Sequence, residues 1–482
     1  MIYDEDYFKS EDFRELLDSY ETAVQTGSYP FMDADDLVDI ADYYNMSGEH
    51  DKAVEAVAHA LEIYPAATLP NVFMAREALT YGDFEEAKRY ADAIEKTDDP
   101  DYHYLRAELL IAEGDIKQAD RYLRNYGRTV PSDELEDFIR DCANLYIDYG
   151  VSDKAYEWMM RSKGDDSVDF KELMARTLFG LGKYKDSERL FNELIDRDPY
   201  STRYWNALAS AQFMNEEYNE SITSSEYALA IDPNDEDGLV SKANGLIRLG
   251  NYEEALKYFH RYTEMEPDDT LGHFHEAACL FNLGRHQEAV EVMEKALAMA
   301  PEDDTHYLAQ VYQELAFGYS ALKQLPKALE MLDKTETLDC DHADIMVIRG
   351  HLQLENEHIE EAEESFKKAI SMSDSSPDIL LRIITSLYDN HYVYACYEMF
   401  RKFFSIIDRL NPDFSNGYAY MALCCYELGH AKEFMQYLRQ ACEKNPDEAR
   451  QVLAFLFPEG TEVKDYYQYM LEKLKEQKET ES

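Results

Sequence analysis

Pairs of small residues separated by twelve positions recur along this chain. Successive second members of the pairs lie 32 to 39 residues apart, and an interval of 34 is the commonest. A period of this length predicts an array of helical hairpins. Ten pairs are Ala41/Ala53, Ala75/Ala87, Ala107/Ala119, Ala143/Ala155, Ala175/Ser187, Ala209/Ser221, Ala243/Ala255, Ala277/Ala289, Ala316/Ala328 and Gly350/Ala362. Two more pairs, Ile383/Ala395 and Ala422/Phe434, keep the spacing but include one large residue each.

The small residues are expected where the two helices of a hairpin cross, because a larger side chain would push the backbones apart. Trp205, Leu208 and Ala209 follow the spacing of one helix face. The partner helix is predicted to end before Pro233, since proline lacks an N–H and cannot continue a helix. Glycine past a first helix supplies the left-handed conformation that closes the helix. Such glycines are Gly48, Gly82, Gly114, Gly150, Gly182, Gly250, Gly284 and Gly429.

The repeat unit also has a residue signature. In the first repeat the signature positions hold Leu37, Ile40, Ala41, Tyr44, Ala53, Val57, Ala60 and Pro65. This unit resembles the 34-residue tetratricopeptide repeat (TPR), in about twelve copies of the cytoplasmic bacterial type over residues 34–446. The resemblance implies an all-α fold, a right-handed superhelical solenoid of antiparallel helix hairpins. The longer intervals predict about five extra residues near Asp304–Leu308 and Ser405–Leu410, as loops or as lengthened helices.

Both ends of the chain depart from the repeat. Residues 1–33 are expected to form an N-terminal capping helix, built on the acidic amphipathic stretch 11–26. Residues 447–482 are expected to form C-terminal capping helices on either side of 457–460. Polar covers of this kind are needed because the terminal repeats of a solenoid otherwise expose their core.

The chain is strongly acidic. It has 47 Lys plus Arg against 99 Asp plus Glu, for a formal net charge of -52. Such a charge repels nucleic acid and anionic lipid, so neither is expected as a partner. The acidic start Met1–Asp6 is unlike a secretory signal, and no stretch approaches the ~20 apolar residues that span a bilayer. The seven cysteines fall mostly in predicted helices and are expected to be core residues. We therefore expect a cytoplasmic protein.

Motifs for catalysis or metal binding are incomplete. The segment His275–Cys279 begins like a zinc-protease helix but has Cys in the place of the second His. The acidic turn 232–238 puts Pro233 at the first ligand position of a calcium loop. The segment 339–344 has metal-capable side chains, but it lies where a helix is expected to begin. We expect no enzymatic activity, no cofactor and no metal.

A row of twelve side chains, ten of them apolar or aromatic, lies four residues after the small residue of each first helix. Its members are Asn45, Leu79, Ile111, Ile147, Phe179, Phe213, Ile247, Phe281, Ser320, Leu354, Leu387 and Tyr426. In one interpretation, the row is a hydrophobic ridge on the concave face that binds a partner segment, with Phe179, Phe213 and Phe281 as its main contacts. In the other interpretation, these residues pack between adjacent hairpins as ordinary core.

Four polar residues also fall at groove-facing offsets in three consecutive repeats: Arg140, Asn144, Arg176 and Arg203. Some TPR domains hold the terminal carboxylate of a peptide with a clamp of Lys or Arg and Asn at such offsets. The resemblance is incomplete, because Leu173 and Ala207 occupy two clamp positions. The alternatives are an anion- or carboxylate-binding spot and salt bridges to nearby acidic residues of the same chain.

These observations favour a non-enzymatic scaffold or adaptor that binds a protein or peptide segment in its concave groove. The expected ligand is basic or carries a free C-terminal carboxylate. The alternative is a structural or regulatory subunit that forms homo-oligomers through its C-terminal repeats, where Phe317, Ile384 and Leu423 make the groove apolar. A peptide-sensing transcription regulator is a third hypothesis, opposed by the negative charge.

Overall fold

The computed structural model describes residues 5–26, 32–162, 164, 166–301, 304–338, 340–458 and 460–480. Across these residues the regular structure is entirely helical, as the repeat predicts. The helices are α1 (Glu5–Phe8), α2 (Glu11–Thr26), α3 (Ala34–Met46), α4 (His50–Ile63), α5 (Thr68–Thr80), α6 (Phe84–Ala93), α7 (Pro100–Ala112), α8 (Ile116–Tyr126), α9 (Leu135–Asp148), α10 (Ser152–Met159), α11 (Val168–Gly180), α12 (Tyr184–Ile195), α13 (Thr202–Met214), α14 (Tyr218–Ile231), α15 (Glu236–Arg248), α16 (Tyr252–Met265), α17 (Thr270–Asn282), α18 (His286–Met299), α19 (Thr305–Ala321), α20 (Leu325–Thr335), α21 (His342–Glu355), α22 (Ile359–Met372), α23 (Pro377–Asp389), α24 (Val393–Leu410), α25 (Tyr418–Glu427), α26 (Ala431–Lys444), α27 (Pro446–Leu453), the short 3₁₀ helix η1 (Ala454–Leu456) and α28 (Val463–Thr480).

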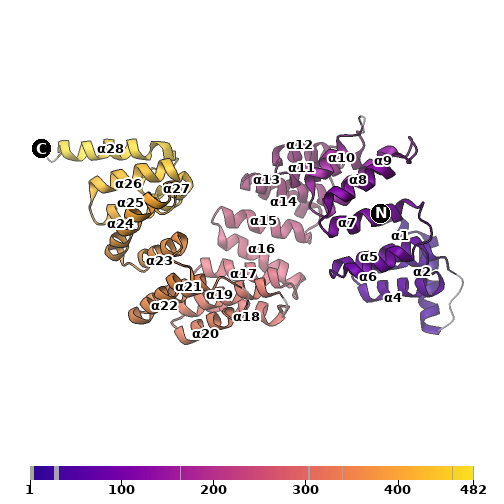
Figure 1. Ribbon diagram of the computed structural model, residues 1–482, viewed down its shortest axis with the longest axis horizontal. Coiled ribbons are helices and arrows are strands. Elements are labelled where there is room, and N and C mark those ends of the chain that lie inside the picture. The colour runs from indigo at the N-terminus through magenta and orange to yellow at the C-terminus, as the bar shows by residue number, and fades with distance from the viewer. Residues whose placement is uncertain are drawn as a thin grey trace. The chain divides into compact units, whose positions relative to one another are not determined.

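Consecutive helices from α3 to α26 make twelve helix–turn–helix pairs in the described part of the chain (Figure 1). The chain divides into two compact units, Met1–Ser241 and Lys242–Ser482, and the division falls within α15. In each unit the helices of a pair pack on one another and on the next pair. The prediction of an all-α array of helix hairpins is therefore confirmed.

The small-residue pairs lie where the helices cross. Both members of the first ten pairs are buried. Two of the pairs show how closely the two backbones approach. In the first, Ser187 Oγ donates a 2.8 Å hydrogen bond to the carbonyl oxygen of Ala175. Ser221 Oγ donates in the same way to Ala209, also over 2.8 Å. A side chain at the crossing thus reaches the backbone of the opposite helix.

The eleventh pair does not follow the expected register. Ile383 is buried, but Ala395 is exposed, and Cys396 takes the buried place beside it. His391, the turn residue with φ of 67°, lies five residues before Cys396, just as Gly82 lies five residues before Ala87. The buried pair of this hairpin is therefore Ile384/Cys396, one residue later than predicted. Cys396 Sγ then lies 3.4 Å from Cys424 Sγ of α25.

Each hairpin turn has one residue with positive φ. The eight predicted glycines have φ values from 69° to 83°. After α5, for example, Gly82 N–H donates to Leu79 O and Asp83 N–H to Ala78 O, which is the Schellman pattern. The other four hairpins use a non-glycine residue at this place: Glu216, Lys323, Glu357 and His391. The sequence did not reveal these four, because glycine was the signal.

The two longer repeat intervals are lengthened helices. Helix α19 has 17 residues and begins at Thr305, and α24 has 18 residues and ends at Leu410. Most first and second helices of the other hairpins have 10 to 14 residues. The extra residues therefore extend α19 at its start and α24 at its end, and they leave α23 and α25 at ordinary lengths.

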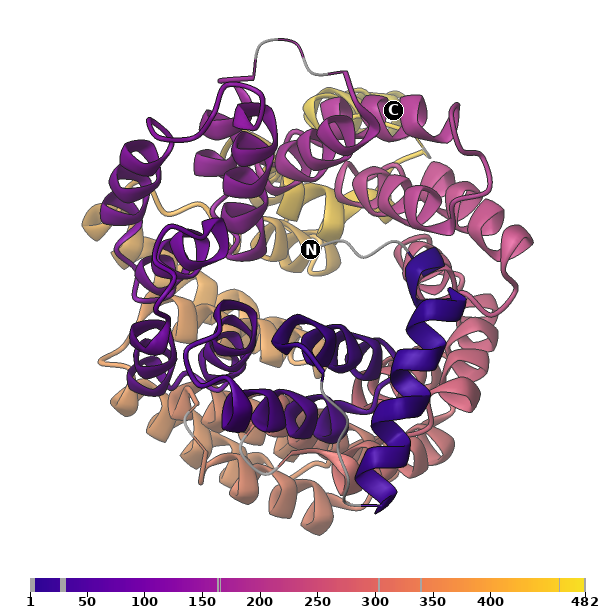
Figure 2. The ribbon, with the colours of Figure 1, turned by 90° about the vertical axis from the view of Figure 1, so that its right-hand side faces the viewer.

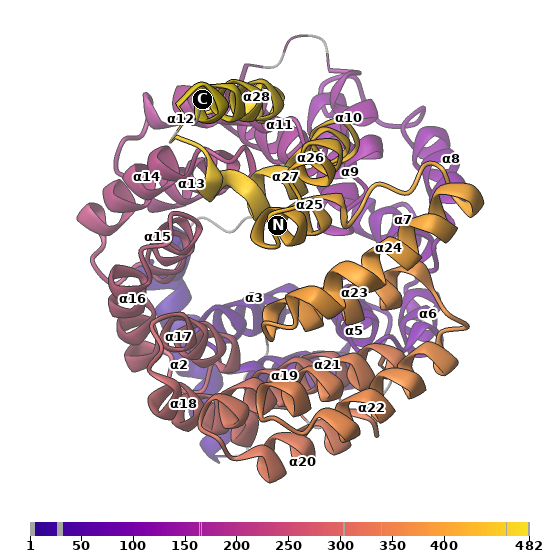
Figure 3. The same ribbon diagram turned by 90° about the vertical axis from the view of Figure 1, so that its left-hand side faces the viewer.

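The end helices bury apolar side chains against the repeats that adjoin them. Helix α2, the long indigo helix of Figure 2, places Phe13 and Tyr20 in one core cluster with Leu37 of α3. In the C-terminal unit α28 packs beside α26 (Figure 3), and Tyr466 stacks on Phe457 with ring centroids 3.8 Å apart. These contacts support the proposal that residues 1–33 and 447–482 act as caps. Among the described residues, no helix combines the length and apolar character that crossing a membrane requires.

Candidate functional site

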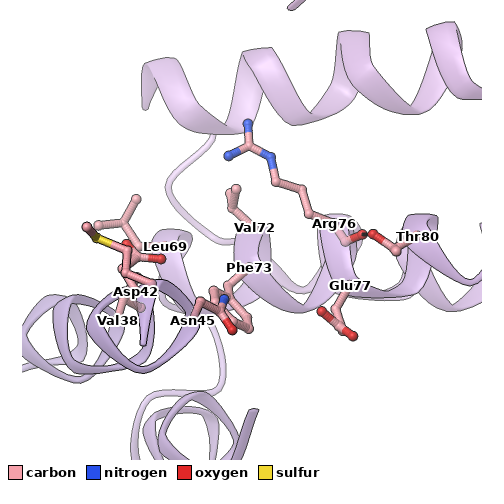
Figure 4. Close-up of a pocket in the computed structure, with 10 residues that line it drawn as sticks. Val38, Asp42, Asn45, Leu69, Val72, Phe73, Arg76, Glu77 and Thr80 are labelled. Atoms are coloured by element: carbon pink, nitrogen blue, oxygen red, sulfur yellow. Dashed lines mark hydrogen bonds between the residues drawn. The ribbon is translucent and has the colours of Figure 1, made fainter. Parts of the chain in front are cut away.

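In the N-terminal unit, residues 1–241, the first helices of the hairpins line open cavities. A cavity of 440 Å³ lies between α3 and α5 (Figure 4), lined by Val38 and Asn45 of α3 and by Phe73 and Arg76 of α5. Arg76 Nε is 2.9 Å from Oε2 of Glu108, a carboxylate that is 7% exposed. The cavity therefore has both apolar and polar lining residues, and its guanidinium is paired with a carboxylate of the same chain.

A second cavity of 620 Å³ lies wholly within residues 1–241. Its wall comes from α9, α11 and α13, from the start of α15, and from Phe191 of α12. Three of the polar residues selected from the sequence, Asn144, Arg176 and Arg203, line this cavity. Arg140, the fourth, is not among the lining residues. The structure thus brings three of the four residues to one site from three consecutive hairpins.

The guanidinium groups of this site are paired with acidic residues of the same chain. Arg176 donates to Asn144 Oδ1 over 3.3 Å and to Asp148 Oδ1 over 3.5 Å. Arg203 makes an ion pair with Glu172, whose side chain is 15% exposed. These contacts favour the second alternative from the sequence, salt bridges within the chain, because each guanidinium has an internal partner.

Arg140 follows the same pattern outside the cavity. It makes an ion pair with Asp137, one turn earlier on α9. This pair joins two residues of one helix and does not connect adjacent hairpins. Arg140 therefore does not line the cavity that Asn144, Arg176 and Arg203 share.

A third cavity, of 370 Å³, adjoins the second and is mainly apolar. Its wall includes Ile147 of α9, Phe179 of α11 and Phe191 of α12. The two cavities share Arg176, Phe191, Ala207 and Ser210. Of the three selected phenylalanines, Phe179 is the one that lines a described cavity. An apolar depression and a charged one are thus contiguous on the same face.

The row of apolar side chains is not a uniformly exposed ridge. Phe179, Phe213 and Phe281 are each half-buried. Phe213 packs edge-on against Tyr218, with ring centroids 5.5 Å apart. Phe281 lies so close to Gly318 of α19 that a Cβ placed there would be 2.7 Å from its ring. Phe281 therefore packs between neighbouring hairpins, and its role as a partner contact stays a prediction.

One part of the second cavity was not expected from the sequence. Asp235 caps the start of α15, and its Oδ1 accepts a hydrogen bond from Gly238 N–H over 2.7 Å. The same oxygen accepts from Nδ2 of Asn206 over 2.6 Å, which joins α15 to α13. Asp237 lies beside it in the cavity wall and is exposed. In the sequence, this part of the cavity is indicated only by the acidic turn 232–238, which partly resembles a calcium loop.

Sequence profiles described as tetratricopeptide repeat match residues 173–236, 240–304 and 343–375. The matched segments contain hairpins from both units. The chain contains tetratricopeptide repeats.

Solved structures similar to this TPR protein include yeast Tom70, at 14% identity and a TM-score of 0.41, covering 88% of this chain and 94% of that chain. A tetratricopeptide repeat protein from Parabacteroides merdae ATCC 43184 is 18% identical with a TM-score of 0.40, over 52% of this chain and 98% of its own. MamA from Desulfovibrio magneticus RS-1 is 17% identical with a TM-score of 0.34, over 36% and 96%. A search of curated protein sequences found no match.

The segments considered for metal binding have structural roles in this TPR protein. Burial lowers the pKa of His275, which stacks on Phe259 at 5.2 Å, and raises the pKa of the Cys279 thiol to about 12. Asp341 caps α21 by accepting hydrogen bonds from the N–H groups of Ala343 and Asp344. Asp339 lies outside the described residues. Within the described ranges, no group of three or more metal-capable side chains comes together.

Proposed function

We propose that this protein is a non-enzymatic cytoplasmic scaffold that binds a segment of another protein along the first helices of its hairpins. The observation that carries the proposal is the position of the cavities. The cavity between α3 and α5 is lined by these first helices alone, and the two adjoining cavities are lined mainly by α9, α11, α13 and the start of α15. Depressions repeated along one face suit an extended segment that places successive side chains in them.

The adjoining cavities also set the character of the proposed ligand. Ile147, Phe179 and Phe191 form a pocket for an apolar side chain, and Arg176 stands between this pocket and the charged one. A segment that crosses Arg176 would therefore place an apolar group and a polar group in neighbouring sites. Such alternation matches an extended peptide better than a compact small molecule.

The test is to fill the groove without removing core packing. Ala207 of α13 is half-buried and lines both adjoining cavities, so Ala207→Gln extends a polar side chain into them. Ala230→Gln on α14 is the matched control, because Ala230 is exposed and lines neither cavity. We expect affinity capture to retain a defined protein on the wild type and the control, and to lose it on Ala207→Gln. Equal capture by all three would contradict the proposal.

Self-assembly is the second candidate. Two of the three residues that suggested it, Ile384 and Leu423, are buried in the core of the C-terminal unit at 1% and 4% exposure. A different surface favours it, since Ile406 and Leu410 lie one turn apart on α24 and are 53% and 77% exposed. Sedimentation velocity of the wild type beside Leu410→Glu tests this. A concentration-dependent oligomer that the substitution abolishes would support self-assembly, and a monomer at all concentrations would exclude it.

A further inference from the structure

We propose that the second cavity binds an arginine side chain of the partner segment, held by the acidic residues at the start of α15. This inference rests on the proposed scaffold function and names the chemistry of one ligand position. It is opposite in charge to the carboxylate-binding spot that Arg140, Asn144, Arg176 and Arg203 suggested. The charges, the burial and the shape of the cavity each support it.

The wall of the second cavity carries more negative than positive charge. Four carboxylates line the cavity, Asp148, Glu172, Asp235 and Asp237, against two guanidinium groups. Both guanidiniums are paired at the α9–α11 side, Arg176 with Asp148 and Arg203 with Glu172. No cationic side chain of the described residues makes an ion pair with Asp235 or Asp237. The α13–α15 side therefore presents uncompensated negative charge in a chain of net charge -52, which attracts a cation.

A buried acceptor provides a second, independent observation. Asn206 lines the cavity and is 8% exposed, and its Nδ2 donates to Asp235. Its carbonyl oxygen Oδ1 is buried and has no hydrogen-bond partner. Buried acceptors in folded proteins are normally satisfied, so an unpaired one in a cavity wall indicates a missing donor. A ligand N–H group supplies that donor.

Guanidinium fits this set of acceptors better than an ammonium group. It is planar and presents five N–H donors in a fixed fork, so one group can reach two carboxylates and an amide oxygen at once. It also stays charged at every physiological pH. The volume of 620 Å³ leaves room for the peptide backbone that carries the side chain. The adjoining apolar cavity would take a neighbouring residue of the same segment.

The probe is acetyl-Gly-(Ala-Arg)₄-Gly-amide, with both termini blocked so that no free carboxylate contributes. The same peptide with citrulline in place of arginine is the neutral isostere, and free argininamide tests whether the side chain suffices without a peptide. Affinity is measured by titration calorimetry at low and moderate salt. Asp237→Asn is the test variant, because Asp237 is exposed and makes no hydrogen bond or ion pair within the described residues. Asp186→Asn on α12 is the control, since it removes the same charge outside the cavity.

We expect Asp237→Asn to weaken binding of the arginine peptide roughly tenfold, and Asp186→Asn to change it by less than about twofold. The double variant Asp235→Asn/Asp237→Asn should weaken it further, and asparagine still caps α15. Two results would overturn the inference: equal loss in both single variants, which indicates only attraction to a negative protein, or no preference for arginine over citrulline. If argininamide binds as tightly as the peptide, the ligand is a free small molecule, and binding of an arginine within a protein segment is excluded.

The failure of this inference is distinguishable from failure of the scaffold function. If capture of the partner is lost in Ala207→Gln but unchanged in Asp237→Asn, the scaffold function is supported and the arginine site is rejected. A partner insensitive to both variants would reject the groove itself. If the acidic peptide acetyl-Gly-(Ala-Glu)₄-Gly-amide binds instead, and Arg176→Gln abolishes that binding, then the cavity is an anion site and the inference is wrong.

Discussion

Ser187 Oγ of α12 donates a 2.8 Å hydrogen bond to the carbonyl oxygen of Ala175 in α11, across the crossing point of their hairpin. Both residues are fully buried. Within a helix that carbonyl oxygen is also the acceptor for the N–H four residues later. The serine hydroxyl therefore adds a bond to a group that is already satisfied, and the close approach of the helices depends on the small size of residue 187.

Substitutions at this crossing separate size from hydrogen bonding. We expect Ser187→Ala to change the free energy of unfolding by less than ~1 kcal/mol, because no buried group is left unpaired. Ser187→Leu should lower it by about 1–3 kcal/mol, since the longer side chain must displace the backbone of α11. Urea unfolding followed by circular dichroism measures both. A larger loss from Ala than from Leu would show that the hydroxyl matters more than the space.

The four non-glycine turn residues predict stabilising substitutions. Glu216 has φ of 62° and is exposed, so Glu216→Gly removes left-handed strain and should raise the free energy of unfolding by ~0.5–1 kcal/mol. Gly182 has φ of 71°, and a Cβ added there would meet only the Tyr184 hydroxyl, at an ordinary contact distance of 3.9 Å. Gly182→Ala should therefore lower the free energy of unfolding by a similar ~1 kcal/mol through backbone strain alone. The urea midpoints of the two variants should move in opposite directions. A shift of both midpoints in the same direction would show that the side-chain contacts of Glu216 stabilise the protein by more than its left-handed backbone strain destabilises it.

Phe281 and Gly318 should be energetically coupled. A Cβ at position 318 would meet the Phe281 ring at 2.7 Å and Val290 at the same distance. We expect Phe281→Ala alone to cost about 2–4 kcal/mol and Gly318→Ala alone about 1–3 kcal/mol. In the Phe281→Ala background, the effect of Gly318→Ala should be smaller, because one of the two obstructing groups is gone. Additive effects in the double-mutant cycle would mean that Phe281 does not pack on α19.

Glu314 predicts a pH dependence of stability. Burial raises the pKa of this carboxyl in the folded protein, and no hydrogen bond or ion pair reaches it from the described residues. The folded state therefore holds the proton more tightly than the unfolded state. At neutral pH the ionised carboxylate of Glu314 lowers the free energy of unfolding, and this loss diminishes as the pH drops through the raised pKa. Glu314→Gln should unfold at higher urea than the wild type at pH 7. That difference should shrink between pH 7 and pH 4.5, and a difference that grows would contradict the assigned burial.

Some residues of the second cavity could be predicted from the sequence, but their contacts could not. Asn144, Arg176 and Arg203 were recognised as groove-facing because the repeat period places the same helical position on the same face of each hairpin. Their partners were not foreseen. Asp148 lies 28 residues before Arg176, and Asp235 lies 29 residues after Asn206, in neighbouring hairpins. The charge of the cavity depends on these contacts, which the period alone does not specify.

The sequence by itself determined the helices, the eight glycine turns and the repeat. These features follow from local sterics: a small residue at the crossing, a left-handed glycine after the first helix and a proline after the second act within one 34-residue unit. Only the tertiary structure decided that Ile384 and Cys396 form the buried pair of the eleventh hairpin. It also decided the half-buried state of Phe281 and the pairing of Arg176 and Arg203 with acidic residues. Those outcomes depend on how side chains of adjacent hairpins fit together, and that fit is a property of packing between repeats.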